Sequence, residues 1–141
     1  NSNYDILDIN ELVTYKRGTT ITKKDVTEGE IPVIAGGQTP AYYHNEYNRS
    51  GETITISSSG AYSGFINYFT TPIFASDCFT ISPNDPSKLL TKFLYLLLKS
   101  KQEEIYKSFL KNTLTEMVRD FFIFELVKNT TRLMRDFKKY F

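Results

Sequence analysis

Groups that could catalyse a reaction are few in this sequence. It holds one histidine, His44, and one cysteine, Cys78, so no His/Cys cluster can bind zinc. No serine has both a base and an orienting acid in prospect, because His44 would have to act without local support. Asp136 and Lys138 have the spacing of a nuclease acid–lysine pair, but a solvated helix face explains them better. The sequence therefore predicts no catalytic residue, no metal site and no cofactor.

Two signatures of nucleotide chemistry are also missing. The sequence contains no Gly-rich loop that leads to Lys-Ser/Thr at the start of a helix, which a phosphate-binding loop requires. It also lacks the Asn-Pro-Pro-aromatic tetrapeptide that amino-methyltransferases carry. Enzymatic activity is therefore not expected of this chain, and binding becomes the more useful hypothesis.

Hydrogen-bonding side chains gather in a few polar stretches. Residues 52–81 (ETITISSSGAYSGFINYFTTPIFASDCFTI) place a Ser/Gly-rich turn between aromatic strands. Such a turn exposes backbone N–H groups and small hydroxyls, which can approach a phosphate backbone or a base edge closely. The alternative is an ordinary hairpin whose glycines satisfy the turn geometry, and this stretch alone favours the hairpin. Residues 41–48 (AYYHNEYN) form a second polar stretch, rich in Tyr and Asn.

Short apolar runs predict the elements that would hold these loops. Residues 53–56 alternate β-branched apolar and polar side chains, which predicts a half-buried strand. Further runs at 65–69, 73–75 and 78–81 predict strands, and 31–34 predicts a short strand that Pro32 places near a sheet edge. We expect loops at 15–26, 35–40 and 41–48, with Thr22 or Lys23 near the cap of a short turn.

The second half of the chain changes to a helical period after Pro83 and Pro86. Leucines and a phenylalanine recur there at helical spacing, which predicts a helix from about residue 87 to residue 109. Beyond it we expect a strand at 121–127 and a last helix that Thr130 or Thr131 caps and that runs to residue 141. Residues 5–13 are expected to form a short helix or strand that docks the N-terminus.

Composition bounds the class of protein. The 141 residues suffice for one domain with a core, and 40% hydrophobic with 23% charged residues is ordinary for a globular protein. The net charge of +1 produces no global field towards nucleic acid, yet residues 1–70 carry −3 and residues 71–141 carry +4. All seven glycines lie between Gly18 and Gly64, so we expect the working surface in that half.

The termini and the lone cysteine carry expectations about processing and compartment. The single Cys78 fits a reducing compartment, and the acidic start of the chain does not look like a signal peptide. No apolar run approaches membrane-spanning length. Because the sequence lacks an initiator Met, we expect a processed chain or a piece of a longer one.

Four stretches in order along the chain resemble the target recognition domain of the specificity subunit of type I restriction–modification systems. They are YKRGTTITKKDVTEGEIPVIAGG (15–37), TPAYYHNEYN (39–48), GETITISSSGAYSGFINYFTTPIFASDCFTISP (51–83) and FLYLLLKSKQEEIY (93–106). The resemblance implies a small α/β (α+β) domain with a mixed or antiparallel sheet and a packed helix, followed by a spacer helix. It also implies that the domain reads one half of a split DNA target and holds a partner methyltransferase there.

The resemblance also sets the expected boundaries: a recognition domain over residues 1–128 and the start of a spacer helix over 129–141. The sequence departs from the family after Tyr106, since residues 107–131 contain neither Gly nor Pro where many relatives carry both. A whole specificity subunit usually has two such domains and two spacers. A chain of 141 residues has room for one, so we expect a half-subunit, a fragment or a repurposed relative.

On this resemblance, cations would meet DNA phosphates and polar or aromatic loop side chains would approach bases or sugars. The candidate phosphate contacts are Lys16, Arg17, Lys23, Lys24 and Arg49. The candidate base or sugar contacts are Gln38, Tyr42, His44, Asn45, Ser58, Ser59 and Tyr62. Asn, Gln and Ser can both donate and accept hydrogen bonds, which base reading needs. Taken singly, each cation is more often a solvated surface group than a DNA contact.

The expected partners are double-stranded DNA, a methyltransferase subunit and, through the C-terminal helix, a second copy or a second recognition domain. One stripe of that helix carries four large apolar residues with little of the domain left to cover them: Leu133, Met134, Phe137 and Phe141. We expect a cytoplasmic protein that meets no membrane. The alternative hypothesis is a structural or protein-interaction module that keeps the fold without reading DNA, which the acidic first half favours.

Overall fold

The computed structural model describes residues 13–87 and 89–110, and these fold as an α+β domain, as predicted. Of the element expected at 5–13, the structure describes Val13, the first residue of β1. The expected elements at 121–127 and 129–141, the boundary at residue 128 and the stripe of Leu133, Met134, Phe137 and Phe141 lie outside the described residues. The elements in order are β1 (Val13–Arg17), η1 (Lys23–Asp25), β2 (Glu28–Ile34), β3 (Tyr42–His44), β4 (Thr53–Ser57), β5 (Ile66–Phe69), β6 (Phe74–Ala75), β7 (Cys78–Pro83), α2 (Thr91–Ser100) and α3 (Gln102–Leu110).

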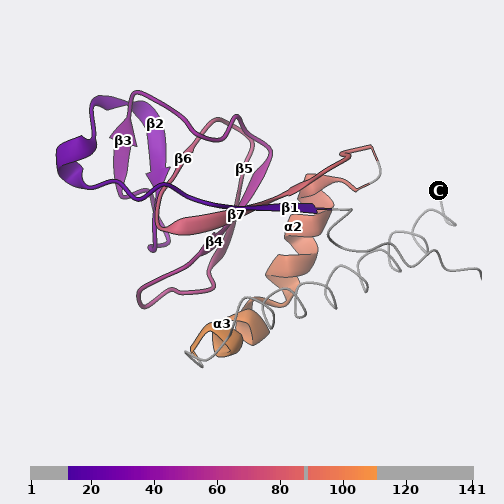
Figure 1. Cartoon of the computed structure of the whole chain (residues 1–141). Coiled ribbons are helices and arrows are strands. Elements are labelled where there is room, and N and C mark those ends of the chain that lie inside the picture. Colours follow the sequence, from indigo (N-terminus) through magenta and orange to yellow (C-terminus); the bar gives the residue numbers. More distant parts are fainter. Residues whose placement is uncertain (1–12, 88, 111–141) are drawn as a thin grey trace, which may run out of the picture.

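The strands form two sheets. The larger sheet is antiparallel with the order β1-β7-β4-β5, and the smaller sheet has the order β3-β2-β6, in which β2 and β6 run parallel. In Figure 1 the smaller sheet lies to the left, the larger sheet in the middle and α2 to the right. The two-residue strand β6 leads directly into β7, so one short connection passes from the smaller sheet to the larger.

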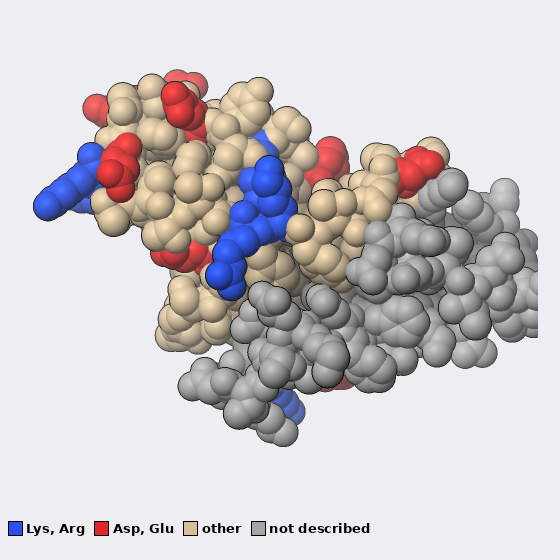
Figure 2. Space-filling model, viewed as in Figure 1, with Lys and Arg blue, Asp and Glu red and all other residues tan. Residues whose placement is uncertain are grey.

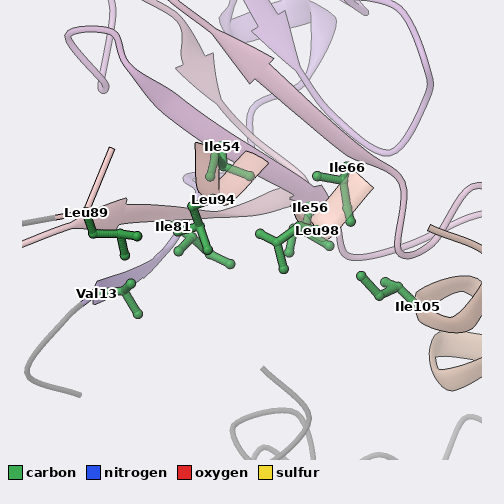
Figure 3. Close-up of a cluster of buried hydrophobic side chains, with 9 residues drawn as sticks. All are labelled: Val13, Ile54, Ile56, Ile66, Ile81, Leu89, Leu94, Leu98 and Ile105. Atoms are coloured by element: carbon green, nitrogen blue, oxygen red, sulfur yellow. The ribbon is translucent and has the colours of Figure 1, made fainter. Parts of the chain in front are cut away.

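The main core lies between the larger sheet and the helices (Figure 3). Its members are Val13, Ile54, Ile56, Ile66, Ile81, Leu89, Leu94, Leu98 and Ile105. β4 is a central strand and all five of its residues are buried, so the prediction of a half-buried strand was wrong. Ile54 and Ile56 face the helices, whereas Thr55 and Ser57 face the segment around Ile34 and Gln38, which covers the second side.

A smaller cluster fills the seam between the two sheets. It contains Ile34, Ile73, Ala75 and Cys78, with Phe69 packed against it. The Cys78 thiol lies 3.5 Å from the carbonyl oxygen of Ile34, and burial raises its pKa to about 12. This thiol is therefore a neutral packing group at ordinary pH.

Three predictions about strands need correction. Residues 15–17 belong to strand β1 and not to a loop, because they pair with β7, with Arg17 opposite Phe79. Residues 42–44 form strand β3 within the predicted loop. β2 is the middle strand of its sheet although it contains Pro32; β6 pairs only with Val33 and Ile34, so Pro32 lies beyond the part of β2 that β6 reaches.

The single helix predicted for residues 87–109 is in fact two helices that meet at Lys101. The side chains on either side of the break bind the edge strand β5. Lys99 Nζ donates to the Ile66 carbonyl at 2.8 Å, while Gln102 accepts from the Ile66 N–H at 2.9 Å and donates to the Gly64 carbonyl at 2.8 Å. These bonds satisfy backbone groups that an edge strand leaves open, and the helix turns where it makes them.

Candidate nucleic-acid interface

Three loops meet around the connection between β6 and β7. Ser76 accepts from the Ile21 N–H through its hydroxyl at 3.1 Å and donates its own N–H to the Ile34 carbonyl at 2.8 Å. Asp77 accepts from the Thr20 hydroxyl at 2.9 Å, and its carbonyl accepts from the Ser58 N–H at 3.3 Å. These bonds gather residues 18–22, 35–40 and 58–64 at one place, and we call this set the loop edge.

Gly18 allows the first of these loops to approach so closely. A side chain at Gly18 would place its Cβ 2.2 Å from the carbonyl oxygen of Ser76, which no real contact permits. With only hydrogen there, the N–H of Gly18 reaches the Cys78 carbonyl at 2.8 Å and that of Thr19 reaches the Ala75 carbonyl at 2.9 Å. The direction in which the chain leaves β1 is therefore fixed by backbone bonds.

The second and third loops touch each other through a buried hydroxyl. Ser57, the last residue of β4, has its Oγ 2.9 Å from the Gly36 carbonyl and 3.2 Å from the Ser59 carbonyl. Next to this contact lies a pocket with an empty volume of about 270 Å³, open solvent included. Gln38, Thr39 and Asn67 are among the residues that line it. Amide and hydroxyl groups of the 35–40 loop and of strands β4 and β5 thus line one concave surface.

The cations around the loop edge are of two kinds. Lys16 and Arg17 are exposed on β1, which enters the loop edge at Gly18, and Figure 2 shows a blue patch over the position of β1 in Figure 1. Lys23 and Lys24 are exposed on η1, two and three residues after Ile21, where Figure 2 shows a blue projection at the left. Four exposed positive charges therefore lie around the polar loop edge.

The turn that carries the two lysines is held by a capping box. The Thr22 N–H donates to the Asp25 carboxylate at 2.9 Å and the Thr22 hydroxyl donates to it at 2.8 Å. These bonds lower the pKa of Asp25, the backbone bond more than the side-chain bond. The prediction that Thr22 or Lys23 lies near the cap of a short turn is confirmed, with Thr22 as the capping residue.

Arg49 is built into the domain. Its Nε donates to the Thr80 hydroxyl at 2.8 Å and its Nη1 to the Asn48 carbonyl at 2.9 Å. Its Nη2 donates to the carbonyls of Lys16 and Arg17, at 3.3 and 3.2 Å. Partial burial lowers the pKa of its guanidinium, which stays a cation at ordinary pH. Arg49 thus joins the end of β1 to β7, and we leave it out of the surface proposed to meet DNA.

Within residues 13–87 and 89–110, no group of three His, Cys, Asp or Glu side chains is placed to hold a metal ion. None of the helices in these ranges is long and apolar enough to cross a membrane. A polar loop surface flanked by cations is thus the feature that a function has to explain.

Residues 1–119 match the profile of the family described as "Type I restriction modification DNA specificity domain". The chain belongs to this family. No curated protein sequence matches this specificity domain closely enough to count as a relative.

Two solved structures resemble the specificity domain over 95% of its length. One is the S subunit of a type I restriction–modification system from M. genitalium, with a TM-score of 0.70 and 20% identity. The other is the HsdS subunit from Thermoanaerobacter tengcongensis, with a TM-score of 0.57 and 13% identity. At these identities the likeness shows the fold alone. The chain spans 40% and 39% of the lengths of these two subunits.

The structure brings together only part of the residue set that the sequence predicted. Gln38, Ser58, Ser59 and Tyr62 lie on the loop edge, and Tyr62 is 45% exposed. Tyr42 is half-buried on β3 beside this edge, where it pairs with Val33.

His44 and Asn45 lie near the other end of β2. A Cβ on Gly29 would be 2.6 Å from Asn45 Cα, and His44 lies opposite Glu28 and Ile31 across a β-bulge, whereas the loop edge begins after Ile34. His44 is 7% exposed, bonded through Nδ1 to the backbone of Thr27 and packed edge-on against Phe74. It therefore holds β3 to the start of β2, and we leave it out of the proposed DNA surface.

Several residues in or beside the loop edge escaped the sequence prediction. Thr20, Thr39, Asn67 and Asp77 bond across the loops or line the pocket. Thr20 and Thr39 each lie two residues after a glycine, Gly18 and Gly37, and a hydroxyl that close to a tight turn is a weak signal that could have been used. The positions of Asn67 and Asp77 depend on strand pairing and give no local signal.

Proposed function

We propose that this specificity domain reads one half of a bipartite DNA site through the loop edge. One observation carries the proposal: the loops bearing Gln38, Ser58 and Ser59 approach closely at Gly36 and Ser59 and share the Ser57 hydroxyl, so their donors and acceptors lie side by side. Amide and hydroxyl groups can satisfy both donors and acceptors on base edges, whereas phosphates carry no sequence information. Tyr62, exposed in the same loop, would pack on a sugar or a base.

Phosphate contacts would come from the exposed cations on both sides of this surface. Lys16 and Arg17 lie at the end of β1, and Lys23 and Lys24 lie on η1. Four such contacts would make binding depend strongly on salt, since each one releases a condensed counterion. Such contacts would allow a chain whose net charge is only +1 to bind DNA.

The proposed function also involves partner proteins. We propose that the chain catalyses nothing itself and positions a methyltransferase subunit on the DNA in the cytoplasm. Residues 129–141 would begin a spacer helix after a recognition domain of residues 1–128. The stripe of Leu133, Met134, Phe137 and Phe141 would meet a second copy or a second recognition domain. The matched subunits are about two and a half times as long as this chain, which supports such an arrangement.

Selection from a pool of random duplexes, with the full chain at low salt, tests the proposal. We expect a short continuous motif, about half of a bipartite site, and an affinity that falls steeply between 50 and 200 mM salt, as about four phosphate contacts require. If no sequence is enriched, or if the enriched duplex binds no better than its scrambled version, the proposal that the chain reads DNA is wrong. The protein-interaction module then becomes the better hypothesis.

A further inference from the structure

The hydroxyl of Ser57 lies where two loops of the loop edge come together. It is 2.9 Å from the carbonyl oxygen of Gly36 in one loop and 3.2 Å from that of Ser59 in the other. A hydroxyl has one proton to donate, so both carbonyls draw on the same donor. Ser57 itself is held in the sheet, since its N–H donates to the Phe65 carbonyl at 2.9 Å and its carbonyl accepts from the Gly64 N–H at 2.8 Å.

Gly36 brings the two backbones into contact at the same point. A Cβ on Gly36 would lie 2.8 Å from the carbonyl oxygen of Ser59 and 3.4 Å from its hydroxyl. Gln38, which lies two residues after Gly36, and Ser59 are both proposed to read bases. The separation between these two reading side chains is therefore set by one shared hydroxyl and one missing side chain.

We propose that Ser57 and Gly36 are positioning residues that join the Gln38 loop and the Ser59 loop into a single reading element. Ser57 is 3% exposed and cannot touch DNA in this fold. Any effect of Ser57 on base preference must therefore pass through the loops. The consequence for DNA reading rests on the proposed function. The joint, by which we mean the contact of the two loops through Ser57 and Gly36, is a property of the free protein.

The variants that test the joint remove one hydroxyl or one close contact. Ser57→Ala removes the shared donor, and Gly36→Ala forces the Ser59 backbone away. Thr53→Val is a matched control, because Thr53 is also a buried hydroxyl of β4 that donates to a carbonyl, that of Gly51 at 3.0 Å, but at the opposite end of the strand. Ser57→Ala and Thr53→Val should lower the melting temperature to a similar, small extent.

The first measurement needs no DNA. In the free chain, Ser57→Ala should shift the amide resonances of residues 35–39 and of residues 58–64 and should speed hydrogen exchange in both loops. Thr53→Val should change neither loop. If Ser57→Ala alters residues 58–64 only, the two loops are not joined through Ser57 and the proposal is overturned. Gly36→Ala gives the same readout from the other loop if Ser57→Ala does not fold.

The second measurement is a double-mutant cycle on the selected duplex with Gln38→Ala and Ser59→Ala. In the wild-type background the two losses of affinity should be non-additive by about twofold or more, since coupled neighbours typically show at least that. In the Ser57→Ala background the losses should multiply independently. A coupling that persists unchanged overturns the proposal. A wild-type chain without sequence preference removes the proposed function instead, and the amide measurement still decides whether the joint exists.

Discussion

The face of the larger sheet that packs on the helices and the loop edge are held by different kinds of force. On one side, the larger sheet packs on α2 through a continuous set of Ile and Leu side chains, among them Ile66 and Leu94, both fully buried. At the loop edge, where the β4–β5 loop lies, neighbouring segments are held by hydrogen bonds among backbone groups and small hydroxyls. Apolar packing resists rearrangement, whereas a hydrogen-bonded loop surface can change its side chains while the scaffold stays in place.

The largest loss of stability is expected for a truncation in the packed core. Leu94→Ala should lower the free energy of unfolding by about 2–5 kcal/mol, because it opens a cavity between α2 and the sheet. Leu96→Ala is the matched control: the same helix and the same change at a side chain 54% exposed, where about 0.5 kcal/mol or less is expected. Urea melts measure both. Equal losses for the two variants would mean that the face of α2 is assigned wrongly.

The helix break is the next largest expected effect, because it uses hydrogen bonds in place of packing. Gln102→Ala leaves the Ile66 N–H and the Gly64 carbonyl without the bonds that Gln102 makes, and should cost about 1–3 kcal/mol. Glu103→Ala, at the exposed neighbouring position, is the control and should change stability little. Hydrogen exchange at Ile66 reports the same loss locally. Unchanged protection of the Ile66 amide in the Gln102 variant would remove this account of the break.

Charge at the loop edge should alter binding and leave stability almost untouched. Replacing Lys23 and Lys24 together by Ala should weaken binding similarly for all duplexes and reduce the salt slope by about two, one for each lost phosphate contact. Lys92→Ala, near the start of α2, serves as the control and should leave the slope unchanged. Binding isotherms at several salt concentrations measure this. A changed base preference with an unchanged slope would assign the two lysines a reading role instead.

The smallest expected effect is the dependence of stability on pH through Tyr68, a residue of β5. Tyr68 donates its phenolic hydroxyl to Glu52, and this bond, with lesser contributions from burial and charge, raises the pKa of Tyr68 from 10.0 to about 12. A raised pKa means that the bond stabilises the fold fully below pH 10 and is lost as the pH rises from 10 to 12. Ultraviolet titration should show one late-ionising phenol that Tyr68→Phe removes. A titration identical in both proteins would contradict the assignment.

The sequence predicted three of the four strands of the larger sheet, β4, β5 and β7, because residues 53–56, 65–69 and 78–81 alternate or cluster apolar side chains. It failed at β1, whose polar residues Lys16 and Arg17 become a strand only because β7 offers a paired edge. The break at Lys101 was also invisible, since the apolar period continues through it while Lys99 and Gln102 bind a strand far away in sequence. Long-range pairing overrode the local signal in both cases.

The candidate surface was predictable in its chemistry and less so in its membership. A Ser/Gly-rich turn and a Gly-Gly-Gln loop indicate exposed hydrogen-bond donors, and the structure places both in the loop edge. His44 and Arg49 have the right residue types as well. His44, however, is buried against Phe74, and Arg49 already bonds to the end of β1 and to Thr80. Residue type alone cannot distinguish a free hydrogen-bonding group from one that the fold already uses.

The burial of Cys78 has a practical consequence for following this domain as it opens. Its thiol lies in the seam between the two sheets, against the carbonyl of Ile34, and it is the one cysteine of the chain. A thiol-specific reagent in excess can modify it only after the seam has separated. The rate of modification therefore reports how often the junction that holds the loop edge in place opens, and no engineered cysteine is needed.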